Sequence, residues 1–546
     1  MLKKVFTSED NELLEKSPSL NEVKEVIENS NLHAAPGSDG ITSYLYKVCL
    51  EILGCHLTEV MQAIFEGNNL SNSQRTSLMV FGTKPMKAAS IQPKDKRKIS
   101  LLNSDFKTAT GILAKRLKLV STHTLSPNQF VAGSNRKIHH CVNLARDAIV
   151  AANKSNGTCG ILDADFMAAF DYLDMNWVFM VLEKKGLCQN VINKVRNIYK
   201  DNKTTVVVNN VLGSSFPNLR WSLHQGDVPS MYWFAYGIDP LLDYLDKCLK
   251  GILICRLPEH GPALPDQLDR PSYIEQRYKV VGYADDLKPA ITSLHELHMV
   301  ESAISLFEKS SGCRLHRDPA SGKCKLLPLG KWRRTLNQED MPFQFIRLSE
   351  HLDMLGVELF ATPTQTKKSN GDRLQSVIKN IIGSWQAGRF MPLIQRPWSV
   401  NSYALSKLWY KCNCIDLRVQ DCKGIHSKVL SWIYSDQLEK PESIILFRPI
   451  QSGGLGLHHV ALKAKSMLIR SFLDTAINPD YINSLYHNAL FRFYVLKETD
   501  FADPGSSPYY SEDFFKTIVA ANENPQLNII NMSSKQWYEF LLGKEI

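Results

Sequence analysis

The chain has 546 residues, a formal net charge of +9, 44% hydrophobic residues and 22% charged residues. This length allows more than one hydrophobic core, and the composition is that of an ordinary globular protein rather than a repetitive or low-complexity chain. The N-terminus lacks a secretory apolar region, and no apolar stretch reaches membrane-spanning length. The twelve cysteines have no regular spacing. We therefore expect an intracellular protein, nuclear or cytoplasmic and not secreted, with free thiols and no membrane partner.

Two sequence features suggest a ligand but also have simpler explanations. Much of the positive charge clusters between Lys84 and Lys118, as in "TKPMKAASIQPKDKRKISLL". Such clusters attract polyanions, although an ordinary solvated surface has the same composition. A zinc site is conceivable from Cys412, Cys414, Cys422 and His426. These residues lack a regular paired-cysteine spacing, so the pattern does not favour zinc.

The first half of the chain contains both helical and strand patterns. A capping-box pattern at Ser19 and Glu22 predicts a helix that is followed by a tight loop, "APGSDGI", at 35–41. A second helix is expected over 100–120, with a basic face formed by Lys107, Lys115, Arg116 and Lys118. "TCGILDADF" predicts a short strand that ends in acids. "TTVVVNNVLGSSF" predicts a β-hairpin that turns at Asn209 and Asn210.

The second half begins with a helix over 295–311, which Gly312 ends. Its apolar face contains Leu297, Val300, Ile304 and Phe307. "HLDMLGVELF", at 351–360, is a strand candidate, and the pattern beyond about residue 370 is mostly helical. Strands and helices alternate irregularly, which indicates an α+β fold.

Two segments carry closely spaced carboxylates. "GILDADFMAAFDYL" contains Asp163, Asp165 and Asp171, and "KVVGYADDLKPAI" places Asp285 and Asp286 between two apolar runs. If the two segments are neighbouring strands, three carboxylates converge, and a divalent metal must compensate their repulsion. Oxygen ligands in a shallow cleft suit Mg²⁺, and two such ions about 4 Å apart support in-line phosphoryl transfer. The alternative is a solvated turn beside unrelated surface acids.

The order of the motifs favours the metal site. The chain resembles the reverse transcriptases of non-LTR (LINE-type) retrotransposons over roughly residues 20 to 470. "VVGYADDL" resembles their Y-x-D-D hairpin, "DFMAAFD" their D-x-x-K-A-F-D motif, and "HQGDVPSMYWFAYGIDPLL" their R-Q-G-D-P-L-S segment. Further resemblances, in the same order as in the family, occur in "APGSDGI", "KDKRKISLLNSDFKTATGILAKRL", "SGCRLHRDPASGKCK", "LGV" at 355–357 and "SGGLGL" at 452–457.

The resemblance implies an RNA-directed DNA polymerase with fingers, palm and thumb. Asp165, Asp285 and Asp286 would be the catalytic acids on an antiparallel palm sheet. With the Phe166 carbonyl they would hold two Mg²⁺ ions, for which Mn²⁺ is a substitute. Lys323, or alternatively Lys325, would protonate the leaving pyrophosphate.

The resemblance also implies how the incoming nucleotide is held. Lys84 and Arg97 would bind the triphosphate, and Gln225 and Gly226 would contact the nucleotide and its templating pair. Phe170 would exclude a 2′-hydroxyl as a steric gate, and its alternative role is that of a core aromatic. The implied partners are an RNA template, a DNA primer or nicked target DNA, and dNTPs.

The implied organisation has four parts. An N-terminal extension would cover 1–64, the fingers and palm 65–360, and a helical thumb with its continuation 361–470, while 471–546 stays unassigned. The polymerase motifs begin near Met1 and no nuclease motif follows them, so we expect any endonuclease activity to be separate.

Some positions depart from the family pattern. Ala168 stands in place of Lys, His224 in place of Arg, and Val228 with Pro229 in place of Pro-Leu. No metal ligand is lost, but these departures leave open a nucleic-acid-binding remnant without catalysis. An RNA-templated RNA polymerase with a similar palm is a further alternative.

Overall fold

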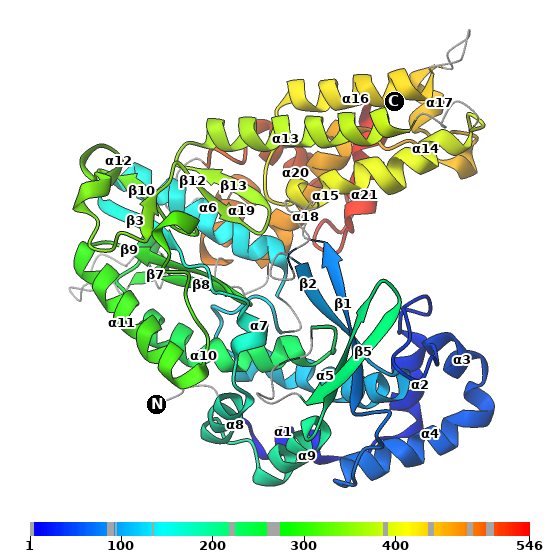
Figure 1. Cartoon of the computed structure of the whole chain (residues 1–546). Helices are drawn as coiled ribbons and strands as arrows, with labels where there is room; N and C mark the ends of the chain where they lie inside the picture. Colours follow the sequence, from blue (N-terminus) through cyan, green and yellow to red (C-terminus); the bar gives the residue numbers. More distant parts are fainter. Residues whose placement is uncertain are drawn as a thin grey trace.

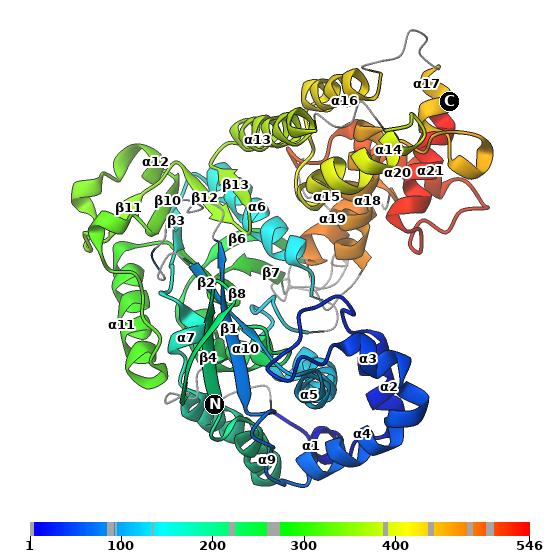
Figure 2. The same cartoon turned by 45° about the vertical axis from the view of Figure 1, so that its right-hand side comes forward.

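The computed structural model contains helices and sheets in three groups (Figures 1 and 2). In Figure 1 the N-terminal helices lie at the lower right, the larger sheet lies at the left, and the C-terminal helices, coloured yellow to red, lie at the top. The structure describes residues 5–83, 92, 96–133, 136–217, 223, 225–258, 273–385, 391–434, 442–477, 484–497 and 507–545.

A five-stranded sheet carries the acidic segments. Its strand order is β11 (Ile346–Leu348), β10 (Cys324–Gly330), β3 (Thr158–Asp163), β9 (Asp286–Ile291) and β8 (Val280–Tyr283). Neighbouring strands are antiparallel except β10 and β11, which are parallel. The predicted strand that ends in acids is therefore confirmed, and it neighbours the second acidic segment.

Both faces of this sheet are covered. Successive residues of a strand point to opposite faces, and here they enter two different cores. Leu162 and Leu287 belong to a core shared with α10 (Ser230–Cys248) and α11 (Leu294–Ser311). Ile161 and Ala290 belong to a second core shared with α6 (Ile138–Ser155). Because both faces are buried, β3 is apolar from Cys159 to Leu162 before it ends in Asp163, whereas β9 begins at Asp286 and carries Lys288 before its apolar end.

The four-stranded sheet has the order β2 (Lys96–Leu101), β1 (Thr76–Thr83), β4 (Lys203–Val208) and β5 (Val211–Pro217). The predicted hairpin is confirmed in β4 and β5. Its turn residues Asn209 and Asn210 have φ of 51° and 63°, the left-handed conformation that Asn tolerates well. The helix predicted over 100–120 is partly wrong, because Ser100 and Leu101 pair with β1 and α5 spans Ser104–Thr124.

The N-terminal helices are α1 (Ser8–Glu15), α2 (Leu20–Glu28), α3 (Ser43–Val48) and α4 (Leu50–Phe65). The capping box of Ser19 and Glu22 is confirmed at the start of α2. Glu22 also accepts hydrogen bonds from Arg116 Nε at 2.9 Å and Nη2 at 3.0 Å. Arg116 is buried in this pair. Arg116 therefore does not contribute a free cation to the basic face predicted for this helix.

Shorter elements connect these parts. They are α7 (Ala169–Tyr172), α8 (Met175–Lys184), α9 (Gln189–Tyr199), β6 (Ile252–Pro258), β7 (Tyr273–Tyr278), α12 (Trp332–Thr335), β12 (His351–Met354) and β13 (Val357–Phe360). Gly312 ends α11 with φ of 77°, and the four predicted apolar residues of α11 are buried, so both predictions are confirmed. The single strand expected at 351–360 is instead the hairpin β12–β13, which turns at Leu355 and Gly356 with positive φ at both residues.

The described chain is mostly helical from residue 363 on, which confirms the helical pattern predicted beyond about residue 370. The helices are α13 (Pro363–Ser384), α14 (Gln395–Ser399), the π-helical segment η6 (Val400–Leu405), α15 (Ser406–Cys412), α16 (Val419–Ile433), α17 (Ser443–Phe447), α18 (Val460–Ile477), α19 (Ser484–Tyr494), α20 (Glu512–Asn522) and α21 (Ser534–Glu545). One hydrophobic core runs from Leu374 to Leu542. The C-terminal region that the sequence left unassigned therefore shares a core with the helices before it.

Two further sequence observations concern the whole chain. All twelve cysteines are free thiols, and Cys412, Cys414 and Cys422 are buried in the helical part. Burial raises the pKa of Cys422 to about 12, so the thiolate that zinc requires is disfavoured there. A search of the described helices for an apolar span as long as a bilayer finds none.

Candidate active site

The turn of the β8–β9 hairpin presents two adjacent aspartates. Tyr283 pairs with Asp286, so Ala284 and Asp285 form a two-residue turn. Ala284 has φ of 54°, in the left-handed region where glycine is usual. The Ala284 N–H donates to Gln129 Oε1 at 3.2 Å. A buried side chain from another part of the chain therefore supports this strained turn.

Asp165 lies beside this turn. The chain continues extended after β3, and Ala164 bridges Leu287 while Phe166 bridges Leu315. The Asp165 carbonyl accepts from the His316 N–H at 2.9 Å, and the Met167 N–H donates to the Arg314 carbonyl at 2.7 Å. These bonds fix the backbone on both sides of Phe166. Its own carbonyl points to the other edge of the segment, because ladder bonds alternate in direction along an antiparallel pair.

A lysine and a histidine side chain lie near the Asp165 carboxylate. Lys323 Nζ is 3.7 Å from Asp165 Oδ2, and His316 Nε2 is 3.6 Å from the same oxygen. The Lys323 side chain is 56% exposed, so it is accessible to a bound substrate. Lys325 instead lies 3.4 Å from Asp353 Oδ2. Of the two lysines that the sequence offered, the structure brings Lys323 to the acids.

The acids raise one another's proton affinity. Burial, together with the nearby Asp286 and Asp165 carboxylates, raises the pKa of Asp285. Burial raises the pKa of Asp163 to about 6, although the Lys288 ammonium opposes this shift. Burial alone would lower the pKa of Lys288, but the Asp286 and Asp163 carboxylates raise it, so Lys288 stays charged.

The donor set fits a hard divalent cation. It contains only carboxylate and carbonyl oxygens, and mutual repulsion among Asp165, Asp285 and Asp286 is the penalty that such an ion relieves. Within the described ranges, the one trio of His, Cys, Asp or Glu side chains with all ligand atoms within 4.8 Å is His351, Asp353 and Glu358. At least one pair of carboxylate oxygens among Asp165, Asp285 and Asp286 is therefore more than 4.8 Å apart.

The trio of His351, Asp353 and Glu358 is part of an ion-pair network on the β12–β13 hairpin. Asp353 lies 3.4 Å from Lys325 Nζ, and Glu358 accepts from Arg373 Nη1 at 2.6 Å. Because cations already neutralise both carboxylates, this trio has less need of a metal than the three aspartates do.

The residues expected to hold the incoming nucleotide lie on β2 and on the loop before α10. Arg97 is exposed on β2, while Lys98 Nζ contacts Asp171 Oδ2 at 2.9 Å and thereby connects β2 to α7. The Gln225 carbonyl accepts from the Ser100 N–H at 2.8 Å. Gly226 has φ of 130°, and a Cβ there would lie 2.6 Å from the Ser100 carbonyl oxygen. Lys84 and His224 lie outside the described residues.

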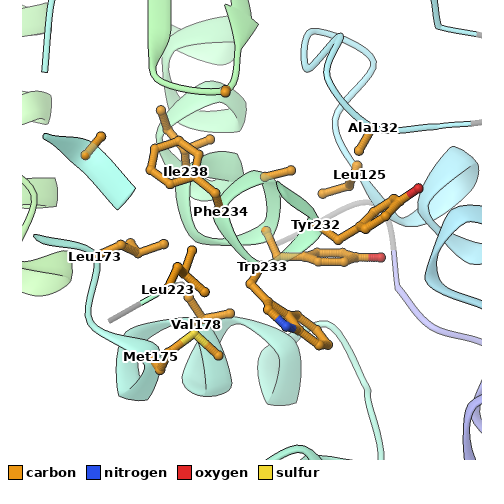
Figure 3. Close-up of a cluster of buried hydrophobic side chains, with 14 of the residues drawn as sticks. Leu125, Ala132, Leu173, Met175, Val178, Leu223, Tyr232, Trp233, Phe234 and Ile238 are labelled. Carbon is orange, nitrogen blue, oxygen red and sulfur yellow. The ribbon is translucent and has the colours of Figure 1, made fainter. Parts of the chain in front are cut away.

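Phe170 is half-buried on the short helix α7. Its ring stacks on Phe234 of α10, with centroids 4.7 Å apart. Ala168, which precedes α7, has φ of 39°, so the chain turns sharply between Asp165 and Phe170. Figure 3 shows Phe234 and its neighbours on α10 packed among Leu173, Val178 and Leu223. The exposed edge of Phe170 is therefore supported by a rigid core.

Sequence reasoning missed three residues of this site. Gln129 and Arg136 precede the acids by many residues, and Arg136 Nη1 donates to the Gln129 carbonyl at 2.6 Å. No local pattern marks either residue as a support for the hairpin. Lys288 did have a signal, because it follows Asp286 by two residues in a strand and therefore shares its face.

Comparison with known proteins agrees with this geometry. The family described as "Reverse transcriptase (RNA-dependent DNA polymerase)" matches residues 84–359, which include all the acids described above. A relative in Xenopus laevis, "Transposon TX1 uncharacterized 149 kDa protein", is 23% identical over 459 residues. The match covers 83% of this chain and 33% of the relative, so the chain spans about a third of that protein's length. The chain belongs to the reverse transcriptase family, the RNA-directed DNA polymerases, and its resemblance to a transposon protein supports the retrotransposon type that the ordered motifs predicted.

Proposed function

We propose that this chain synthesises DNA on an RNA template for a non-LTR retrotransposon, by adding dNTPs to a primer 3′-hydroxyl. Its fingers, palm and thumb would correspond to the four-stranded sheet with the N-terminal helices, the five-stranded sheet, and the C-terminal helices. The observation that carries the proposal is the approach of Asp165 to the Asp285–Asp286 turn across β3 and β9.

The acids would hold the metal ions. Asp165, Asp285, Asp286 and the Phe166 carbonyl supply oxygen ligands for two Mg²⁺ ions, or for Mn²⁺ in their place. When bound, these ions would lower the pKa of the primer 3′-hydroxyl and neutralise charge on the leaving pyrophosphate. The chain itself contributes the fixed placement of the ligands, since Gln129 holds the turn and the Leu315 bridge holds Phe166.

Cationic residues would act on the triphosphate. Lys323, near Asp165 and accessible, would donate a proton to the leaving pyrophosphate. Arg97, exposed on β2, would bind the phosphates together with Lys84. Gln225 and Gly226 lie against Ser100 on the same strand, so they are positioned to contact the nucleotide that Arg97 holds.

Phe170 would select deoxyribose. Its stacking on Phe234 gives it a fixed position on α7, just after the turn that follows Asp165, where a 2′-hydroxyl would meet the ring. Phe170→Ala is expected to admit ribonucleotides with at least about tenfold less discrimination, because the steric barrier is removed. If Phe170→Ala does not change the choice between ribonucleotides and deoxyribonucleotides, Phe170 is only a core aromatic. That result would also favour the alternative of an RNA-templated RNA polymerase.

The primary test is primer extension. The protein would be given an RNA template, an annealed DNA primer, dNTPs and Mg²⁺, beside an Asp285→Ala variant. Extension by the parent and none by the variant is expected, with primer–template binding retained by both. Tight binding without extension by either protein would instead favour a catalytically decayed binding remnant, and Ala168 would be the first position to restore, as Ala168→Lys.

The partners follow from this activity. We infer an RNA template and a DNA primer or nicked target DNA, with the nick made by a separate endonuclease activity. The corresponding domains would be an N-terminal extension at 1–64, the polymerase domain at 65–360, the thumb with its continuation at 361–470, and a C-terminal region at 471–546. An intracellular location, nuclear or cytoplasmic, would suit these substrates.

A further inference from the structure

A buried ammonium lies against the proposed metal ligands. Lys288 is 1% exposed and follows Asp286 by two residues on β9, so the two side chains share one face. Lys288 Nζ donates to Asp163 Oδ1 at 2.5 Å and also contacts Asp286 Oδ1. One cation therefore connects a proposed ligand, Asp286, to an acid that has no assigned role.

This arrangement differs from an ordinary buried ion pair. Elsewhere in the chain Lys185 Nζ and Asp239 Oδ2 form such a pair at 2.6 Å, with both side chains fully buried. Lys288 instead contacts two carboxylates. Besides burial, the Asp286 and Asp165 carboxylates raise the pKa of Asp163 and also that of Asp285, so the four acids lie close together. The local cluster thus contains four carboxylates and one buried ammonium.

The charge of this cluster determines how strongly it attracts a divalent cation. With all groups ionised, the four carboxylates and Lys288 carry a net charge of −3. Loss of Lys288 would make the cluster −4, and loss of Asp163 would make it −2. Loss of both would restore −3. The other nitrogen-bearing side chains that face the acids, Lys323 and His316, are the same in all four cases.

We propose that Lys288 is a positioning residue that sets the divalent-cation affinity of the active site, with Asp163 as its fixed counter-ion. Lys288 holds one oxygen of Asp286 and leaves the other for the metal, while its charge opposes metal binding. Asp163 holds the ammonium in place and offsets that opposition. This proposal rests on the proposed function, because it assumes that Asp285 and Asp286 bind the metal.

The test is a Mn²⁺ titration of the full chain, followed by electron paramagnetic resonance, without nucleotide or nucleic acid. Lys288→Met is expected to bind Mn²⁺ about tenfold more tightly, and Asp163→Asn about tenfold more weakly, as a one-charge change near a divalent ion produces. The double variant Asp163→Asn/Lys288→Met is expected to return close to the parent. Lys288→Arg, which keeps the charge, is expected to stay near the parent as well.

Controls separate this proposal from its premise and from misfolding. Arg116→Met breaks the pair of the buried Arg116 with Glu22 and is expected to lower the melting temperature without changing Mn²⁺ affinity. If Asp285→Ala fails to weaken Mn²⁺ binding by the parent, the proposed metal site itself is wrong. If Asp285→Ala abolishes binding but Lys288→Met leaves affinity equal or lower, the role of Lys288 is overturned. The double variant remains decisive if Lys288→Met alone does not fold.

Discussion

The side-chain oxygen of Gln129 accepts a hydrogen bond from the backbone N–H of Ala284, 155 residues away in the chain, at 3.2 Å. The flanking backbone joins the same contact, since the Phe130 N–H donates to the Gly282 carbonyl and the Gly282 N–H to the Asn128 carbonyl, each at 2.8 Å. Gln129 is fully buried. The segment around Gln129 therefore fixes the position of the aspartate turn through hydrogen bonds to Ala284 and Gly282.

Gln129→Leu tests this support. The substitution removes the acceptor for Ala284 while keeping a side chain of similar size. The free energy of unfolding is expected to fall by about 1–3 kcal/mol, because a buried backbone N–H loses its partner. Primer-extension kcat is expected to fall at least about tenfold, since a small displacement of catalytic groups is costly. Binding of primer–template should not change.

A matched control is Gln74→Leu. Gln74 is also buried, and its Nε2 donates to Asp105 Oδ2 at 2.8 Å. This variant should lose stability without a comparable loss of kcat. Equal losses of kcat in the two variants would show that Gln129 acts through general stability rather than through the turn.

Gly226→Ala should damage the contact between the loop before α10 and β2. A Cβ at Gly226 would lie 2.6 Å from the Ser100 backbone oxygen, and φ of 130° strains any L-residue. We expect a loss of about 2 kcal/mol or more in unfolding free energy and a raised KM for dNTP. Gly383→Ala, a helical glycine with open space around its Cβ position, should be neutral or stabilising.

Asp227 gives the stability of the protein a pH dependence. Burial raises its pKa from 3.8 to about 6, although hydrogen bonds from Tyr199 and Thr110 oppose the shift. The folded state then binds the proton more tightly than the unfolded state. The free energy of unfolding should therefore fall as pH rises from about 4 to about 6, by about 3 kcal/mol from this group, and then level off.

The measurement is the melting temperature of the parent and of Asp227→Asn between pH 4 and pH 7. The Asn side chain keeps an acceptor for the Tyr199 hydroxyl, which donates to Asp227 Oδ2 at 2.6 Å. The difference between the two proteins should shift in favour of the variant as pH rises. A difference that is constant with pH would mean that Asp227 does not titrate in this range.

The sequence predicted the acid-bearing strands because their signals are local. The apolar run before Asp163, the paired Asn209 and Asn210, and Gly312 after an amphipathic helix each determine their own backbone. Ser100 shows the limit of such signals. The sequence predicts a helix from Ser100, but pairing with β1 and the hydrogen bond to the Gln225 carbonyl determine its extended conformation.

The support of the site could not be predicted because it is non-local. Gln129 and Arg136 form hydrogen bonds with backbone groups. Every residue has the same backbone groups, so no residue type in the sequence marks the partner. The C-terminal region was unassigned for a related reason. Its helices have ordinary apolar spacing, and only the folded core shows that Trp537 and Phe472 pack in the same cluster as Leu374.

A buried arginine provides the test of how this C-terminal region is attached. Arg146 on α6 is fully buried and donates to the Cys414 carbonyl at 2.6 Å, to the Tyr510 hydroxyl at 2.8 Å and to Asp147 Oδ1 at 2.9 Å. Its guanidinium also lies 4.5 Å from the centre of the Tyr509 ring. One side chain thus joins the helix behind the catalytic sheet to two separate parts of the helical region.

Arg146→Met should lower the free energy of unfolding by about 3–5 kcal/mol, because Asp147 stays buried without its main partner. Tyr510→Phe, which removes one hydroxyl from the same cluster, should cost about 1 kcal/mol. Hydrogen exchange in α20 should accelerate in Arg146→Met, since Tyr510 directly precedes that helix. Lys516→Met, which breaks an exposed pair with Glu512 on the same helix, is the control and should change neither quantity. Unaltered exchange in α20 despite a large loss of stability would mean that the C-terminal region is held by its apolar core alone, and Arg146 would then stabilise α6 rather than the attachment.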